Sequence, residues 1–133
     1  ESGTTAHYMD VNLDTGPIIR QKKFVVSKFD TVESLLRKSA DLEMELALEL
    51  LEEINEGVKP VSLNQDESAA TEHFEKRVLA DSEVDPSKSL NELYDSIRVC
   101  DPELYPAFFS VDGEKVGIKL FRLSKPEEEE DLI

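Results

Sequence analysis

The stretch "TTAHYMDVNLDTGPII", residues 4–19, decides the fold of this chain. Thr, Tyr and Val are frequent in residues 4–11, and β-branched and aromatic residues recur in "IIRQKKFVVS", residues 18–27, so both segments have the composition of strands. Between them, "NLDTGP" combines the Asn, Asp, Gly and Pro that favour a tight connection. We therefore expect two strands that flank a loop, with His7 on the first strand and Asp14 on the loop.

A long amphipathic helix is expected to follow the two strands. Asp30 and Glu33 have the spacing of a capping box at its start, and Gly57 marks its end. Apolar residues recur at spacings of three and four: Leu36, Ala40, Met44, Ala47, Leu51 and Ile54, with Leu42, Leu46 and Leu50 widening the same face. Such a stripe predicts a helix face that is buried in the core against a sheet.

The second half of the chain predicts smaller elements. "TEHFEKRVL" has the composition of a short strand. Ser89 and Glu92 form a capping box for a second helix, which bears an apolar face. In "AFFSVDGEKVGIKLF" the pair Asp112 and Gly113 supplies the two-residue turn of a β-hairpin.

Composition limits the possible classes of protein. A chain of 133 residues suits one domain, and a formal net charge of -15 disfavours nucleic acid as a partner because phosphate backbones are repelled. No apolar run approaches the roughly 20 residues that cross a bilayer, and no secretory signal is apparent, so no membrane association is expected. The single cysteine, Cys100, is expected in a helix and excludes an internal disulfide, which favours a reducing, cytoplasmic location.

The order of the motifs resembles that of the formyltransferases that use formyl-tetrahydrofolate. The opening stretch is similar to that family's strand, Leu-Asp-x-Gly step and Ile-rich strand. The capped helix with "INEG" follows, and then "LNQDESAAT", "KRVLADSEVD", "SLNELYDSIRVCDPELYPAFF" and "VDGEKVGIKLF", in family order. The resemblance covers nearly the whole chain and is greatest to sugar N-formyltransferases and to proteins like methionyl-tRNA formyltransferase.

This resemblance implies an α/β fold that forms the C-terminal part of a Rossmann-like formyltransferase domain. Two strands and the long helix would form the end of the catalytic core (residues 1–60), a small helix and β-hairpin would form an extension (61–125), and an acidic tail would follow (126–133). Two further catalytic groups of the family, an Asn and a His, lie well upstream of the aspartate, where this chain has only thirteen residues. We therefore expect a fragment of a formyltransferase that is inactive by itself.

The resemblance also assigns candidate site residues. Asp14 aligns with the catalytic aspartate, His7 takes a supporting role, and the backbone of Val11, Asn12 and Leu13 borders the pterin ring of the folate. An amine that attacks a formyl carbonyl must lose a proton, which a carboxylate can accept. From the residues alone, an Asp before a Gly is ordinarily turn chemistry, and a strand histidine is ordinarily a hydrogen-bonded core or edge residue. Both interpretations stay open at this stage.

Cofactor and partners follow from the same resemblance. Formyl-tetrahydrofolate would be the donor, and the acceptor would be an amine, by preference an amino sugar nucleotide. The alternatives are a fragment of a methionyl-tRNA formyltransferase, which the acidic composition disfavours, and a dimerisation or binding module without chemistry. An apolar face left uncovered in such a fragment would favour a homodimer.

The remaining polar candidates are weaker. His7, His73 and Cys100 lack the spacing of metal ligands, so no metal is expected, and His73 is expected on the surface. Arg98 matches a position at which the family carries an arginine, although a cation at a helix end that holds the last turn is an equally good explanation.

Overall fold

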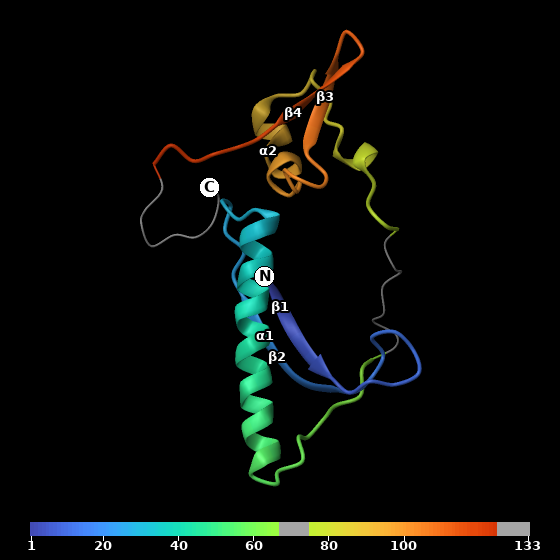
Figure 1. Cartoon of the computed structure of the whole chain (residues 1–133), viewed down its shortest axis with the longest axis vertical. Coiled ribbons are helices and arrows are strands. Elements are labelled where there is room, and N and C mark those ends of the chain that lie inside the picture. The colour runs from blue at the N-terminus through green and yellow to red at the C-terminus, as the bar shows by residue number, and fades with distance from the viewer. Residues whose placement is uncertain (67–74, 125–133) are drawn as a thin grey trace. The chain divides into compact units, whose positions relative to one another are not determined.

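The computed structural model describes residues 1–66 and 75–124 (Figure 1). The chain forms two compact units. Unit 1 comprises Glu1–Val26 and Arg37–His73, and unit 2 comprises Ser27–Leu36 and Phe74–Ile133. The mixed α/β architecture expected from the sequence is confirmed.

Unit 1 is a two-stranded ribbon beside most of the long helix α1 (Val32–Asn55). Strands β1 (Ser2–His7) and β2 (Ile18–Phe24) pair in antiparallel fashion, and their register shifts between Ala6 and His7 (Figure 1). Both strands are shorter than predicted, because β1 ends before residue 8 and β2 before residue 25. The shift in register falls at the strand end that carries His7, where such irregularities re-aim a side chain.

The helix α1 begins one residue later than the predicted cap requires. The carbonyl of Thr31 accepts from the amide of Leu35, so Thr31 is the N-cap residue. Its amide donates to the hydroxyl of Ser34 (3.0 Å), and its own hydroxyl accepts from the Ser34 amide (3.4 Å). The carboxylate of Asp30 is buried and accepts from the Ser27 amide and the Ser34 hydroxyl, so it orders the residues ahead of the helix.

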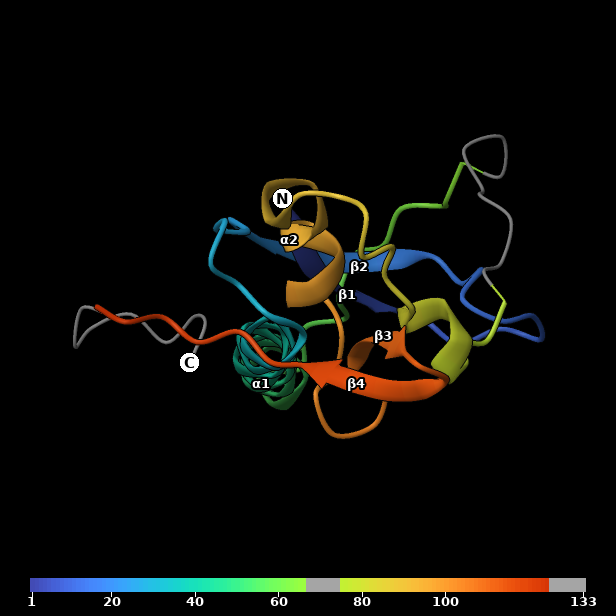
Figure 2. The same ribbon diagram turned by 90° about the horizontal axis from the view of Figure 1, so that it is seen from above.

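Ion pairs fix the face of α1 that lies against the ribbon. Arg20 and Lys22 alternate along β2 and therefore point to one side of it. Arg20 donates to Glu49 (3.2 Å) and Glu53 (2.5 Å), and Lys22 donates to Glu45 (2.9 Å) and Glu49 (2.6 Å). The bond from Lys22 is the main reason why the pKa of Glu49 lies below its ordinary value. Figure 2 looks along α1 and shows it beside the two strands.

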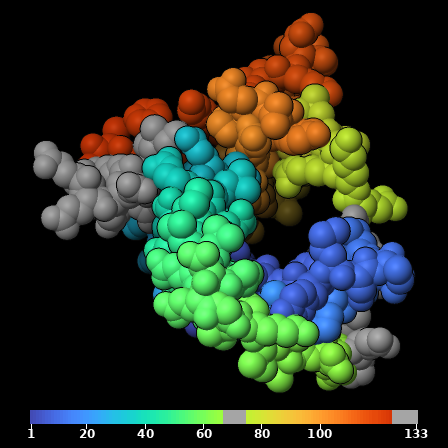
Figure 3. Space-filling model, turned by 60° about the horizontal axis from the view of Figure 1, so that its bottom comes forward, coloured from blue at the N-terminus to red at the C-terminus, as the bar shows by residue number. Residues whose placement is uncertain are grey.

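The prediction that the apolar stripe of α1 forms the core is wrong. Leu46, at the margin of the predicted face, is 2% exposed, and Leu42 and Leu50 are half-buried. The stripe itself is exposed, and its large members are 58% to 65% exposed: Leu36, Met44, Leu51 and Ile54. The reason is that the acidic face of α1 pairs with Arg20 and Lys22, and a ribbon of two strands is too narrow to cover the other side as well. In the space-filling view of Figure 3, the second half of α1 (green) stands at the surface.

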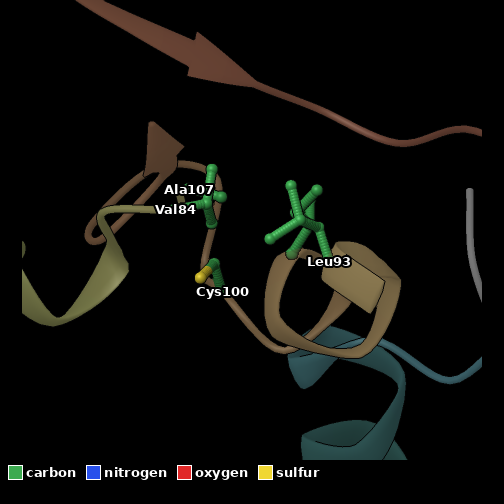
Figure 4. Packing of buried hydrophobic residues seen from close by; sticks show 5 residues of the cluster. Val84, Leu93, Cys100 and Ala107 are labelled. Carbon is green, nitrogen blue, oxygen red and sulfur yellow. The ribbon is translucent and has the colours of Figure 1, made fainter. Parts of the chain in front are cut away.

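Unit 2 contains a short 3-10 helix η2 (Leu79–Ser82), a helix α2 (Leu90–Arg98) and a hairpin of β3 (Ala107–Val111) and β4 (Glu114–Ile118). Its core is a cluster of Val84, Leu93, Ile97, Cys100 and Ala107. Figure 4 shows the side chains of this cluster between α2 and the start of β3. Cys100 lies just beyond α2 and not within it, and its burial makes it a core residue.

The local signals in unit 2 are largely confirmed. The hydroxyl of Ser89 accepts from the Glu92 amide, and the Glu92 carboxylate accepts from the Ser89 amide, so the predicted capping box caps α2. Asp112 and Gly113 form the hairpin turn with φ angles of 50° and 87°. In "TEHFEKRVL", residues 75–78 form no strand and Leu79 begins η2, while the first four residues lie outside the described part of the chain.

Arg98 ties α2 to the segment that precedes α1 within unit 2. Its guanidinium donates to the carbonyl oxygen of Asp30 (2.7 Å), and its Nε pairs with the Asp95 carboxylate (2.6 Å). Tyr94 donates to the carbonyl oxygen of Lys28 (3.0 Å). Arg98 therefore makes a tertiary hydrogen bond to Asp30 in addition to the ion pair with Asp95 within its own helix. In the described parts of the chain, no helix combines the length and apolarity needed to cross a bilayer.

Candidate functional site

His7 and Asp14 line one groove in unit 1. The groove has a volume of about 490 Å³ and is bordered by β1, the loop between the strands, Gln65 and the polar side of α1 around Ser39 and Glu43. The carboxylate of Asp14 is 74% exposed, and the imidazole of His7 is 25% exposed. The acid therefore points into an open groove and not into packed protein.

The imidazole of His7 lies between a carbonyl group and the Asp14 carboxylate. Its Nδ1 is 2.9 Å from the carbonyl oxygen of Tyr8, and its Nε2 is 3.7 Å from Asp14 Oδ1. A carbonyl oxygen only accepts hydrogen bonds, so Nδ1 must carry the proton of that bond. The nitrogen that faces Asp14 is then Nε2.

This tautomer decides what the pair can do. In a neutral ring that is protonated at Nδ1, Nε2 presents a lone pair towards the carboxylate, which is electrostatically unfavourable. The contact becomes attractive when a proton sits on Nε2 or on the carboxyl group. The two side chains therefore lie side by side at the edge of the groove, with Nε2 of His7 towards the carboxylate.

The loop that carries Asp14 depends on Gly16. A Cβ atom at residue 16 would lie 1.6 Å from the carbonyl oxygen of Tyr8 and 3.3 Å from His7 Nδ1, so only glycine lets the loop approach β1 this closely. Asp14 itself has a φ of 57°, in the left-handed region that Asp and Asn tolerate better than most residues. The Leu-Asp-x-Gly step therefore has a steric basis in addition to any chemical one.

Asp10 stabilises the same loop from within. Its Oδ1 accepts from the Thr15 hydroxyl (2.7 Å) and from the Asn12 amide (2.8 Å). These two bonds, the one from Thr15 first, hold the pKa of the Asp10 carboxyl below its ordinary value of 3.8. The loop is thus ordered by an ionised side chain that differs from the candidate catalytic acid.

Val11, Asn12 and Leu13 form the outer part of this loop. The side chain of Val11 is almost fully exposed, and that of Leu13 is largely exposed. The backbone amide of Asn12 donates to the Asp10 carboxylate. Exposed apolar side chains suit a flat heteroaromatic ring such as a pterin, so these residues fit the donor that the resemblance implied. Their proposed role stands on that fit.

Gln65 is a site residue that sequence reasoning missed. Its side-chain amide donates to the carbonyl oxygens of Asp14 (2.8 Å) and Gly16 (2.7 Å), which are 51 and 49 residues away in the sequence. No local sequence pattern predicts a hydrogen bond over such a separation. The only signal was the position of Gln65 within "LNQDESAAT", a segment that belongs to the family-like order of motifs.

Cys100 belongs to the core of unit 2, and His73 lies outside the described residues. Within residues 1–66 and 75–124, no group of three or more His, Cys, Asp or Glu side chains is placed to hold a metal ion.

Comparison with a protein-family model places the match on this part of the chain. Residues 1–51 match the family described as formyl transferase. The matched range contains β1, the Asp14 loop, β2 and most of α1. All the candidate residues from His7 to Gly16 lie inside it.

Solved structures share the fold over a longer range. An uncharacterised protein from Mycobacterium tuberculosis, suggested to be a sugar N-formyltransferase, is 23% identical over 92% of this chain and 54% of its own length, with a TM-score of 0.70. A 4-N formyltransferase from Francisella tularensis is 24% identical over 87% and 49%, with a TM-score of 0.68. Methionyl-tRNA formyltransferase from Clostridium thermocellum is 28% identical over 81% and 44%, with a TM-score of 0.60.

These comparisons confirm the resemblance to formyltransferases that the sequence indicated. The chain spans about half the length of the solved structures that it matches. The family match and the structural neighbours agree on formyl transfer as the general chemistry with which this fold is associated.

Proposed function

We propose that this chain supplies the proton-handling part of an active site that transfers a formyl group from formyl-tetrahydrofolate to an amine, with an amino sugar nucleotide as the acceptor. One observation carries the proposal: Asp14 and His7 meet at 3.7 Å in an open groove, on the segment that matches the formyl transferase family. A loop whose only task was to turn the chain would not need its acid to face a strand histidine across that groove.

Asp14 acts as the proton acceptor for the attacking amine. Its exposed carboxylate can reach a substrate in the groove while it lies beside His7. His7 stabilises the charge that Asp14 carries when Nε2 is protonated, and the carbonyl of Tyr8 fixes the orientation of the ring. General acid–base groups of this kind contribute about 10²- to 10⁴-fold to a rate.

Val11, Asn12 and Leu13 bind the folate through their exposed edge. When bound, formyl-tetrahydrofolate supplies the activated formyl carbonyl. The loop that holds the pterin is the loop that holds Asp14, so binding of the donor and placement of the acid are coupled through the same backbone. The bonds of Asp10 to Thr15 and Asn12 keep this loop in one conformation.

Charge favours a sugar nucleotide over a tRNA as the acceptor. The formal net charge is -15, and a surface of this sign gains little of the counterion-release affinity that dominates binding to nucleic acid. A sugar nucleotide has one or two phosphate groups and can be held by a small number of local contacts. The acceptor nitrogen attacks as a neutral amine, becomes cationic as the C–N bond forms, and loses the proton that Asp14 is assigned to accept.

The test is a formyl-transfer assay on the polypeptide encoded by the complete reading frame, run beside the 133-residue chain. Amino sugar nucleotides and methionyl-tRNA are offered as acceptors with formyl-tetrahydrofolate. We expect turnover with an amino sugar nucleotide by the complete polypeptide, and no turnover by the 133-residue chain. Asp14→Asn should lower kcat at least 100-fold, because Asn tolerates the same left-handed backbone but cannot take the proton.

A matched control is Asp112→Asn. Asp112 also has a positive φ, 50°, and also precedes a hairpin turn glycine, but it lies in unit 2. This variant should keep the wild-type kcat. Turnover retained by Asp14→Asn would refute the catalytic assignment, and preferential formylation of methionyl-tRNA would refute the assignment of the acceptor.

Self-association is a second candidate function, and the exposed stripe of α1 favours it. Leu36, Met44, Leu51 and Ile54 form an uncovered apolar row on one helix, and such surfaces commonly mark interaction sites. Sedimentation measured across the micromolar range should show a dimer that Met44→Lys dissociates. A wild-type monomer throughout that range would exclude this function.

A further inference from the structure

The Asp14 loop has an unusual backbone that needs support from outside. Asp14 has a φ of 57°, and Gly16 passes so close to Tyr8 that no side chain fits there. The amide of Tyr8 donates to the carbonyl oxygen of Pro17 (3.0 Å), which closes the base of the loop. The carbonyl oxygens of Asp14 and Gly16 need donors that come from elsewhere in the chain.

Gln65 supplies both donors from one atom. Its Nε2 lies 2.8 Å from the Asp14 carbonyl oxygen and 2.7 Å from the Gly16 carbonyl oxygen. Both partners are acceptors only, so the side-chain nitrogen and not the oxygen must face them. The two hydrogens of one amide group thus bridge the residues on either side of Thr15.

The segment that carries Gln65 is itself fastened to the ribbon. Leu63 and Ile18 exchange two backbone hydrogen bonds of 2.8 Å each, and the Tyr8 hydroxyl donates to the carbonyl oxygen of Pro60 (3.2 Å). Residues 60–65 are therefore held at the end of β1 and at the start of β2. The amide of Gln65 acts from a fixed base, and it lines the same groove as His7 and Asp14.

We propose that Gln65 is a positioning residue for Asp14: by bridging the Asp14 and Gly16 carbonyls it keeps the left-handed turn closed and the carboxylate beside His7. Its catalytic significance rests on the proposed function, whereas its effect on the loop does not. Gln65 acts on the backbone of the loop and needs no contact with the reacting atoms.

The first experiment measures loop order in the 133-residue chain without substrate. Gln65→Glu keeps the shape of the side chain but replaces the donor by an ionised acceptor, which repels the two carbonyls at pH 7. Order parameters from ¹⁵N relaxation for Asp14, Thr15 and Gly16 should fall from about 0.85 to below about 0.6. Amide shifts around Leu46 should stay unchanged, which shows that unit 1 remains folded.

The neighbouring residue provides a control for charge. Asn64→Asp makes the same change from amide to acid one position earlier, on an exposed residue. The loop should remain ordered in this variant. Gln65→Lys, which restores a donor of sufficient reach, should return the order parameters towards those of the wild type.

The second experiment uses kinetics of the complete polypeptide. Gln65→Glu should lower kcat about 10- to 100-fold with little change in KM for the acceptor, since a displacement of about 1 Å at a reacting group costs rates of this size. A residue needed only for stability would lower the melting temperature and the fraction of active enzyme without this selective loss of kcat.

The outcomes separate the two proposals. An Asp14 loop that stays ordered in Gln65→Glu, as in Asn64→Asp, overturns the positioning role whatever the activity. A loop that loosens in a protein whose wild type transfers no formyl group overturns the proposed function and leaves the structural effect of Gln65 established. Equal kcat values for wild type and Gln65→Glu, with a loosened loop, would also overturn the positioning role in catalysis.

Discussion

Replacing Gly16 by alanine tests whether the candidate acid is placed by a close backbone approach. The added Cβ would stand 1.6 Å from the carbonyl oxygen of Tyr8, a separation that must grow to at least 3.0 Å. The obstacle is a backbone atom of the residue that follows β1, so the loop itself has to move, because no flexible side chain is there to give way. The movement would break the bond from Tyr8 to Pro17 and both bonds from Gln65.

The size of the effect follows from these lost contacts. A hydrogen bond contributes about 0.5–1.5 kcal/mol net, so losing three lowers the free energy of unfolding by about 1.5–4.5 kcal/mol. The carboxylate of Asp14 would move with its backbone, away from His7. Because a misplacement of about 1 Å costs about 100-fold in rate, kcat of the complete polypeptide should fall by at least this factor.

Urea unfolding of the 133-residue chain and amide shifts of residues 8–17 measure the structural part. Gly57→Ala is the matched control, because Gly57 has a φ of 79° and a Cβ there meets open space. That variant should lose about 1–2 kcal/mol from its left-handed backbone and keep the loop shifts of the wild type.

A Gly16→Ala protein whose loop shifts and unfolding free energy match those of the wild type would refute the reasoning. Such a result would mean that Tyr8 and the loop separate easily. The Leu-Asp-x-Gly step would then lack its steric basis.

Two further predictions concern the packing of unit 1 and its dependence on pH. Leu46→Ala should lower the free energy of unfolding by about 2–5 kcal/mol in urea titrations. Leu51→Ala, on the exposed stripe, should change it by less than about 1 kcal/mol. Equal losses in the two variants would contradict the observed orientation of α1. Because the bonds from Thr15 and Asn12 lower the pKa of Asp10, its ionised form stabilises the loop above its ordinary pKa of 3.8, and this stabilisation is lost as the pH falls through the lower pKa of the folded state. An NMR titration of the Thr15 and Asn12 amides with a midpoint at or above 3.8 would contradict this.

Elements specified by a few adjacent residues could be predicted from the sequence. The turn at Asp112 and Gly113 needs positive φ angles that this pair adopts readily, and the capping box of Ser89 and Glu92 closes within one helical turn. The start of α1 was displaced by one residue because two overlapping cap patterns occur there. The pattern that includes Thr31 prevailed: Thr31 and Ser34 bond to each other, while the Asp30 carboxylate accepts from the Ser27 amide and the Ser34 hydroxyl.

The candidate site was predictable in its acid and histidine but not in what holds them. His7, Asp14 and Gly16 lie within ten residues of one another, so a single sequence motif contains all three. Gln65 reaches the loop from a distant part of the chain, and its contact depends on the pairing of Leu63 with Ile18. That pairing consists of two backbone hydrogen bonds between segments far apart in the sequence. The composition of neither segment indicates that they pair.

The exposed stripe of α1 shows what hydrophobic periodicity specifies and what it leaves open. Spacings of three and four established that α1 has an apolar face, and the structure contains that helix. Which face is covered depends on the partner. The ribbon offers Arg20 and Lys22, whose charges require carboxylates, and Glu45, Glu49 and Glu53 provide them at intervals of one turn. Because the acidic row and the apolar stripe lie on different sides of one helix, satisfying these charges leaves the apolar stripe in solvent.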